Sequence, residues 1–220
     1  MAALLATVLT GCTGLGGTGI DGGDPPRGTR PSYLATITTQ VPNVSALSHR
    51  IWTPGLDDGY VPQGLASDGG DLFVSAYRPV PDLTSNAGPC RVFRVDATTG
   101  RSTGSFDIPA DACRHAGGLA HGGDGRLLLA DTWRLLLIDV ARALATGTSA
   151  GASKVVTLAG SLRGAYATFD GRDFWIGTWT RDQPLQARMF RLDRKLFDEY
   201  DGGTVTDAQA TAAIAVPLEA

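Results

Sequence analysis

The sequence predicts an all-β fold, a β-propeller of four-stranded antiparallel blades, on the basis of three observations. One pattern of short apolar runs occurs three times between residues 64 and 218. Side chains within the runs alternate with the period of two that is typical of β-strands. Gly is abundant, with 29 of 220 residues, and Asp-Gly pairs separate several of the runs, as tight hairpin turns require. Repeats of about 40 to 50 residues with four strands each are the sequence signature of propeller blades.

The first unit consists of the segments 64–77, 91–100 and 105–109. A turn at residues 68–70 divides its first segment into two strands. In the second of these strands, alternation predicts that one set of side chains points to one face of the sheet and the intervening set to the other. The two sets are Phe73, Ser75 and Tyr77, and Leu72, Val74 and Ala76.

The second and third units repeat this order of segments. They comprise 118–132, 134–139 and 154–160, and then 165–179, 188–193 and 213–218. An Asp recurs at one place in each unit, at Asp96, Asp139 and Asp193. Because apolar residues do not recur at i, i+3 and i+4, helices are expected only as short turns at 140–146 and 194–200.

Three units are fewer than the four to eight blades of a closed propeller. We therefore expect residues 33–220 to form an incomplete propeller domain with two open flanks. Large side chains such as Phe73, Tyr77, Trp175 and Trp179 are expected on those flanks. An exposed apolar flank favours self-association.

The N-terminal residues 1–12 look like an export signal. Residues 2–10 are apolar, and Leu9, Thr10 and Gly11 precede Cys12 in a pattern that resembles the lipobox of bacterial lipoproteins. This resemblance implies cleavage before Cys12, a lipid on its thiol, and anchoring to the outer face of a bacterial membrane. A basic segment should precede the apolar run, so we expect the true start to lie upstream. The alternative is a buried apolar strand or helix.

Residues 13–32 are rich in Gly, Thr and Pro and nearly free of large apolar side chains. Such a segment buries too little surface to offset the entropy of ordering it. We therefore expect a flexible tether between the lipid and the folded domain.

With Cys12 assigned to the lipobox, Cys90 and Cys113 remain. One remaining cysteine pair in an exported protein most simply forms one disulfide. The chain has neither a CxxC motif nor a Cys/His cluster with zinc spacing, so no structural metal site is predicted.

Blade topology predicts one face that collects the loops at 78–90, 109–117, 160–164 and 180–187. Both remaining cysteines fall in this set. Loops on a rigid scaffold commonly carry binding residues. The candidate ligand-binding residues on this face are Gln63, Tyr77, Arg114, His115, Asp131, Arg163 and Trp179.

Each candidate has a structural alternative. His115 and Asp131 are compatible with an acid–base or metal-binding pair, or with a hydrogen-bonded loop residue and a cap on backbone amides. Arg114 and Arg163 suit a carboxylate or phosphate ligand, or salt bridges between blades. Tyr77 and Trp179 suit packing between blades, or a ligand platform.

Two short motifs resemble known propellers. Residues 128–132, after a Gly-Asp-Gly turn, resemble the second strand of NHL-type blades, and residues 62–66 are similar to blades of the SMP-30/gluconolactonase-like group. The resemblance covers roughly residues 60 to 218 and concerns architecture, which supports many functions.

The resemblance also implies an alternative function. Enzymes of the gluconolactonase-like group hold a divalent cation at the axis with Glu, Asn and Asp. Here the Glu and Asn residues are Glu199, Glu219, Asn43 and Asn86, and none begins an inner strand. The sequence thus favours a binding or scaffolding module, without an evident cofactor, for an unknown protein or small molecule. A metal-dependent hydrolase with its ligands in further blades is the alternative. The net charge of −3, spread along the chain without long runs, argues against a nucleic-acid-binding role.

Overall fold

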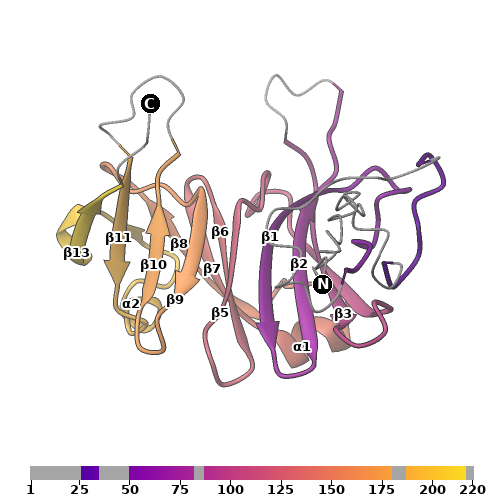
Figure 1. Cartoon of the computed structure of the whole chain (residues 1–220). Coiled ribbons are helices and arrows are strands. Elements are labelled where there is room, and N and C mark those ends of the chain that lie inside the picture. Colours follow the sequence, from indigo (N-terminus) through magenta and orange to yellow (C-terminus); the bar gives the residue numbers. More distant parts are fainter. Residues whose placement is uncertain (1–25, 35–49, 82–86, 180–186, 217–220) are drawn as a thin grey trace, which may run out of the picture.

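Antiparallel sheets of successive strands make up the computed structural model, which describes residues 26–34, 50–81, 87–179 and 187–216 (Figure 1). The first sheet has four strands that pair in chain order. They are β1 (Val61–Asp68), β2 (Asp71–Tyr77), β3 (Cys90–Asp96) and β4 (Ser102–Ile108). The Asp-Gly-Gly turn between β1 and β2 lies where the sequence predicts it, with Gly69 at a positive φ of 58°.

The second sheet repeats the antiparallel order and adds an edge strand. Its strands are β5 (Gly118–His121), β6 (Arg126–Asp131), β7 (Arg134–Asp139), β8 (Ser153–Leu158) and the short β12 (Thr204–Val205). The helix α1 (Val140–Thr146) follows β7, and its N-cap Asp139 accepts a hydrogen bond from the amide of Arg142. The predicted helical turn at 140–146 is therefore confirmed. The parallel pairing of β12 with β8 was not predicted.

The third sheet consists of β9 (Tyr166–Phe169), β10 (Phe174–Gly177), β11 (Arg188–Leu192) and β13 (Ala210–Ala215). The helix α2 (Leu196–Glu199) lies within the second predicted helical turn, and the 3-10 helix η4 (Asp207–Gln209) precedes β13. The last strand begins three residues earlier than predicted. The structure thus confirms the all-β class and the blade-like, four-stranded antiparallel units.

The first strands of the three sheets lie side by side, with β5 in contact with both β1 and β9 (Figure 1). Glycines make this close approach feasible. A Cβ on Gly118 would lie 2.3 Å from the backbone N of Ala167, and one on Gly64 would lie 2.7 Å from the N of Leu119. Side chains at these positions would force the inner strands apart.

Two apolar layers separate the three sheets. Phe73, Tyr77 and Phe106 of the first sheet pack with Leu127 and Leu129 of the second. The other face of the second sheet packs against the third in a layer that includes Leu128, Leu135, Phe174, Ile176 and Phe190. The alternation predicted for β2 is confirmed, because Ala76 and Leu72 lie in a separate cluster on its opposite face.

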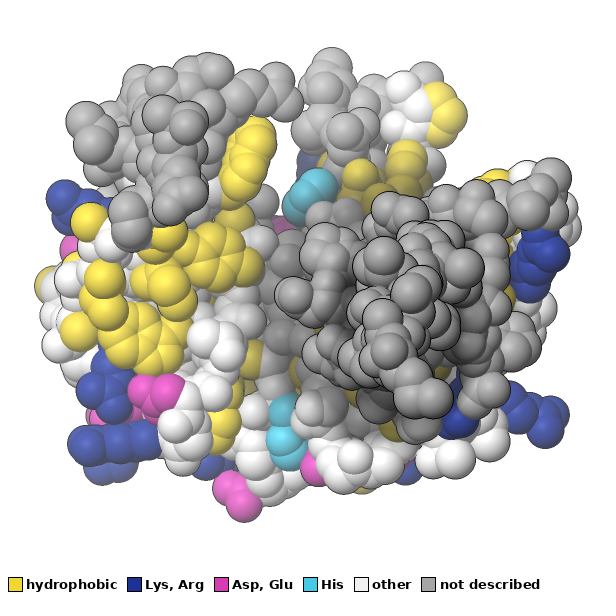
Figure 2. Space-filling model, in the orientation of Figure 1, with side chains coloured by type: hydrophobic (Ala, Val, Ile, Leu, Met, Phe, Trp, Pro, Cys, Tyr) yellow, Lys and Arg dark blue, Asp and Glu magenta, His cyan; other side chains and the backbone are white. Residues whose placement is uncertain are grey.

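The predicted open flanks are partly wrong. Phe73 and Tyr77 are buried against the second sheet, so neither lies on a flank. The outer face of the first sheet is covered by Tyr60, whose ring packs edge-on to Phe93 at 5.4 Å. Alternation predicts which side chains share a face but not which segment covers that face. On the third sheet the prediction holds for Trp179, which is 67% exposed. Figure 2 shows hydrophobic side chains gathered on that side of the molecule.

The described part of the predicted tether, residues 26–32, contacts the segment that precedes β1. Arg27 forms a parallel β-bridge with Ile51, and the amide and hydroxyl of Ser32 donate hydrogen bonds to Asp57. The lipobox and residues 13–25 lie outside the described residues, so the signal and tether predictions remain predictions there. In the described part of the chain, no helix has the length and apolar character needed to cross a bilayer.

Candidate functional site

A disulfide fixes the link between the first two sheets. Cys90 is the first residue of β3, and Cys113 lies in the link 109–117 between β4 and β5. The two form a disulfide with a Cα–Cα distance of 6.0 Å, and both are buried. The predicted pairing is confirmed. It pins the middle of the link to the end of the first sheet.

Asp131, the last residue of β6, holds the same link from the other side. Its Oδ1 accepts hydrogen bonds from the backbone amides of Arg114, His115 and Ala116, at 3.1, 2.6 and 3.0 Å. The carboxyl is only 5% exposed, and Ala116 has a positive φ of 53°. Charge-assisted bonds of this kind stabilise a turn that an L-residue rarely adopts. The amide-cap interpretation of Asp131 therefore fits the structure.

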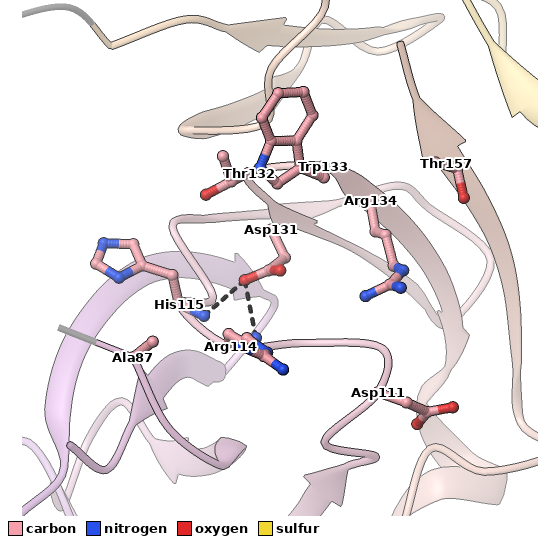
Figure 3. Close-up of a pocket in the computed structure, with 9 residues that line it drawn as sticks. All are labelled: Ala87, Asp111, Arg114, His115, Asp131, Thr132, Trp133, Arg134 and Thr157. Atoms are coloured by element: carbon pink, nitrogen blue, oxygen red, sulfur yellow. Dashed lines mark hydrogen bonds between the residues drawn. The ribbon is translucent and has the colours of Figure 1, made fainter. Parts of the chain in front are cut away.

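The His115 imidazole does not meet the Asp131 carboxylate. Figure 3 shows the ring directed away from it, with only the backbone amide of His115 bonded to the carboxylate. The ring instead stacks on Tyr77, with centroids 4.9 Å apart and planes inclined by 29°. The acid–base pair, one of the two alternatives for these residues, is thus not formed. Tyr77 packs between the first two sheets, which is the structural one of the two alternatives given for it.

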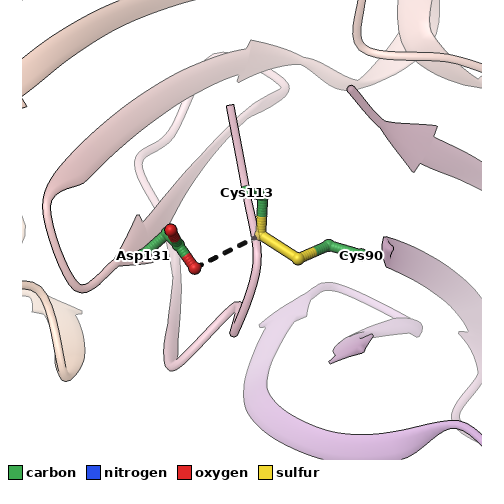
Figure 4. Close-up of side chains that lie close together, drawn as sticks. All are labelled: Cys90, Cys113 and Asp131. Carbon is green, nitrogen blue, oxygen red and sulfur yellow. Dashed lines mark hydrogen bonds between the residues drawn. A yellow bond between two sulfur atoms is a disulfide. The ribbon is translucent and has the colours of Figure 1, made fainter. Parts of the chain in front are cut away.

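One group of side chains in the described residues has the spacing of a metal site, but its chemistry does not fit. It comprises Cys90, Cys113 and Asp131, whose ligand atoms lie within 4.8 Å of one another (Figure 4). The two sulfurs are bonded to each other and are therefore not thiolates, the form that binds metal. The contact of 3.5 Å between Cys113 Sγ and Asp131 Oδ1 is a close approach, because a disulfide sulfur carries no proton.

Of the four residues considered for the hydrolase alternative, the structure describes Glu199. Glu199 ends α2, on the outer part of the third unit. Asn43, Asn86 and Glu219 lie outside the described residues. Nothing in the described part of the chain assembles the Glu, Asn and Asp set that this resemblance implies.

A cleft of about 820 Å³ opens on the predicted loop face beside the disulfide. It lies between the link 109–117, the β6–β7 turn and the first residue of β7. Its lining residues are Ala87, Asp111, Arg114, His115, Asp131, Thr132, Trp133, Arg134 and Thr157. Three of the predicted candidates, Arg114, His115 and Asp131, are therefore brought together here.

Two guanidinium groups are directed into this cleft, from Arg114 in the link and Arg134 at the start of β7 (Figure 3). Among the described residues, neither forms an ion pair with a carboxylate. The inter-blade salt bridge weighed for Arg114 is thus not formed there. Guanidinium groups that form no ion pair in a cleft favour an anionic ligand.

Trp133 borders the cleft and is 51% exposed. The guanidinium of Arg163 lies over its ring, 3.5 Å from the centroid, and donates hydrogen bonds to the carbonyls of Gly160 and Leu162 at 3.0 and 2.5 Å. Burial lowers the pKa of Arg163, with Asp207 opposing that effect. Arg163 therefore supports Trp133 from behind and does not line the cleft itself.

The remaining candidates lie elsewhere. Gln63 is half-buried at a bulge in β1, and its amide donates to the carbonyl of Pro62. Trp179 follows β10 and is not among the lining residues. Trp133 and Arg134 were not among the predicted residues. The loop-face rule, by which blade topology collects certain loops on one face, was applied only to the longer loops. Applied to the two-residue turn after β6, the same rule places both on this face.

Comparison with known proteins adds little. No protein-family model matches the chain, and no curated protein sequence matches it. One solved structure to which the chain is similar is the β-propeller domain of the Trilobed protease from Pyrococcus furiosus, described as having an open velcro topology. The likeness has a TM-score of 0.38 and 8% identity, and it covers 72% of this chain. The chain spans 43% of that protein chain, less than half its length.

Proposed function

We propose that this chain is an exported, lipid-anchored binding module whose ligand occupies the cleft on the loop face. The observation that carries the proposal is the placement of Arg114 and Arg134 in one cleft without a carboxylate partner among the described residues. A disulfide and a buried carboxylate hold the link that carries Arg114. Such pre-organisation reduces the entropy lost on binding.

Two features support export and anchoring, a disulfide in the structure and a motif in the N-terminal sequence. Disulfides form and persist in oxidising compartments, and the disulfide between Cys90 and Cys113 fits that environment. The motif ending in Cys12 resembles a lipobox, and a Gly-rich stretch separates it from the sheets. An anchored domain on such a tether would present its loop face to extracellular ligands or proteins.

Ligand-dependent thermal stabilisation tests the cleft as a binding site. The purified chain is screened against small molecules that include acidic, neutral and basic compounds. A ligand that binds only the folded state raises its stability, by about 2.7 kcal/mol at a hundredfold excess over Kd. The cleft variant is Arg134→Gln, and the matched control is Arg101→Gln, an exposed Arg in the β3–β4 turn.

Stabilisation that Arg134→Gln abolishes and Arg101→Gln preserves supports the cleft. Stabilisation that survives in Arg134→Gln locates the binding elsewhere and contradicts the proposal. A chain that no compound stabilises contradicts small-molecule binding.

The anchor is tested by metabolic labelling. The chain is expressed in bacteria behind a basic N-terminal extension, with labelled palmitate, as wild type and as Cys12→Ala. We expect the wild type to carry label and to partition into detergent, and the variant to do neither. Equal labelling of Cys12→Ala contradicts lipidation at this residue.

A further inference from the structure

We infer that the ligand of this cleft is a sugar acid, a hydroxyl-rich ring that carries one carboxylate, as in a uronic acid. The inference rests on the proposed function and specifies its ligand class. Three features of the lining carry it: the balance of charges, the supply of hydrogen-bonding side chains and the aromatic border. Each narrows the chemistry that fits.

The charges favour a single negative charge over two. Arg114 and Arg134 supply two positive charges, while Asp111 and Asp131 lie in the same lining. The Oδ1 of Asp131 is occupied by three backbone amides, but its charge remains nearby. A guanidinium pairs with a carboxylate through two parallel hydrogen bonds. The two guanidinium groups and the two carboxylates sum to zero charge, so a bound monoanion leaves one negative charge uncompensated and a phosphate dianion leaves two.

Polar groups of the lining suit hydroxyls. The carboxylate of Asp111 is exposed and accepts hydrogen bonds, and the hydroxyls of Thr132 and Thr157 donate or accept them. Thr157 lies directly opposite Arg134 in the β7–β8 pairing. A sugar ring offers hydroxyl donors and acceptors around its rim. Thr157 is therefore placed beside Arg134, while Asp111 and Thr132 line the same cleft.

Trp133 supplies a flat apolar surface at the border of the cleft. Arg163 covers one face of the indole ring, yet the side chain remains 51% exposed. The apolar face of a pyranose ring packs well on such an aromatic surface, since both are flat and of similar size. The Arg163 contact also fixes the ring, so little rotamer freedom remains to be lost on binding.

Four matched probes test the inference by isothermal titration calorimetry. Glucuronate has the ring and the carboxylate, glucose lacks the carboxylate, gluconate lacks the ring, and glucose 6-phosphate carries a dianion. We expect glucuronate to bind about tenfold more tightly than glucose or gluconate, and more tightly than glucose 6-phosphate. Equal affinity for gluconate would contradict recognition of the ring, and equal affinity for glucose would contradict recognition of the carboxylate. Tighter binding of glucose 6-phosphate would contradict the preference for a monoanion.

Variants separate this inference from the proposed function. Arg114→Gln and Arg134→Gln are each expected to weaken glucuronate binding about tenfold, and Trp133→Leu about fivefold, with Arg101→Gln unchanged. Circular dichroism verifies that each variant is folded, and Arg114→Gln changes only an exposed link side chain. If glucuronate fails to bind but other compounds stabilise the chain through Arg134, the sugar-acid inference is wrong and the proposed function stands. If glucuronate binds equally to all variants, the cleft is not the site and both are wrong.

Discussion

The two links that connect the three sheets occupy equivalent places but are held differently. The first, 109–117, is held by a disulfide at Cys113 and by the Asp131 carboxylate. The second, 159–165, is held by a fully buried Leu162 and by backbone hydrogen bonds from Gly164 and Ala165 to the neighbouring strands. Because the first link is fixed through Cys113 and its backbone, the side chains of Arg114 and His115 remain at the surface. The second link is anchored by Leu162 in the apolar layer, and none of its residues lines the cleft.

The second strand of each sheet has a small residue, and these small residues differ in whether they contact a link between sheets. In the first sheet, the Ser75 hydroxyl donates to the carbonyl of Ala116 in the first link, at 3.0 Å. In the second sheet, Ala130 lies against Gly164 of the second link. In the third sheet, Gly177 makes room for the ring of Tyr166 from its own sheet. In the two sheets that are followed by another sheet, the small residue therefore contacts the link to the next sheet.

The largest effect is expected in the second link, from Leu162→Ala. The side chain is fully buried, and truncation of a buried Leu costs about 3 to 4 kcal/mol through lost burial and the cavity left behind. Urea denaturation measures the loss. Leu65→Ala is the matched control, because Leu65 is 63% exposed on β1 and should change stability by less than about 1 kcal/mol. Equal losses at the two positions would contradict the role given to Leu162.

In the first link, the double variant Cys90→Ala/Cys113→Ala is expected to lose about 3 kcal/mol. The two residues are separated by 23 positions, and opening a loop of that size raises the entropy of the unfolded chain by about this amount. The free energy of unfolding is measured with and without dithiothreitol. Reductant should destabilise the wild type and Leu162→Ala but not the double variant. A wild type that is insensitive to reductant after full reduction would contradict the anchoring role of the disulfide.

Sequence patterns located the strands well where the signal was local. Alternation in Phe73, Ser75 and Tyr77 predicts the orientation of β2, because a pleated strand imposes it residue by residue. The two-residue strand β12 has no such signal, since its pairing with β8 depends on residues more than forty positions away. The segment that forms β13 begins with small residues that do not alternate in size, so its start was misplaced.

Topology predicted part of the candidate site. The loop-face rule brought Arg114, His115 and Asp131 together because connectivity alone determines which ends of the strands share a face. It did not reveal that Asp131 bonds the backbone of the link instead of the imidazole, since that depends on the path of the link around Ala116. Trp133 and Arg134 were missed because a two-residue turn resembles an ordinary hairpin.

Asp131→Asn is expected to lose about 2 kcal/mol, since it removes the charge from three hydrogen bonds while leaving an acceptor in place. The measurement is again urea denaturation. Asp111→Asn is the matched control, because Asp111 is exposed in the same link and should change stability by less than about 0.5 kcal/mol. If both variants lose the same free energy of unfolding, the loss comes from the change in net charge and not from the hydrogen bonds between Asp131 and the backbone amides.

Arg163→Gln tests the one place where the second link supports the cleft. The cation–π contact with Trp133 is partly exposed, so its loss should cost only about 0.5 to 1 kcal/mol. Because Trp133 would lose its fixed orientation, acrylamide should quench its fluorescence more strongly. The chain has four Trp residues, so the quenching is compared with that of Trp133→Phe. An unchanged Trp133 contribution would contradict the supporting role of Arg163.

The smallest expected effect on stability concerns the hairpin turn between β9 and β10, at the end of the third sheet that lies away from the loop face. In the first sheet, Asp68 of the equivalent turn lies 3.1 Å from His121 of the second sheet, so that turn joins two sheets. In the third sheet, Asp170 makes its contacts within its own sheet, including an ion pair with Arg191 of β11 at 3.5 Å. Its carboxylate accepts hydrogen bonds from the Asp173 amide, the Trp175 indole N–H and the Arg172 amide, which lower its pKa to about 2.

Because the pKa of Asp170 is lower in the folded state than in the unfolded chain, where it is about 3.9, the carboxylate stabilises the fold above about pH 4. That contribution is lost as the pH falls from about 4 toward 2. Carbon-detected NMR titration should give a midpoint near 2 for Asp170. Trp175→Phe removes the indole N–H donor and should raise this midpoint toward the ordinary value, while Trp133→Phe should leave it unchanged. A midpoint near 3.9 in the wild type would contradict the stabilisation of the Asp170 carboxylate by these hydrogen bonds.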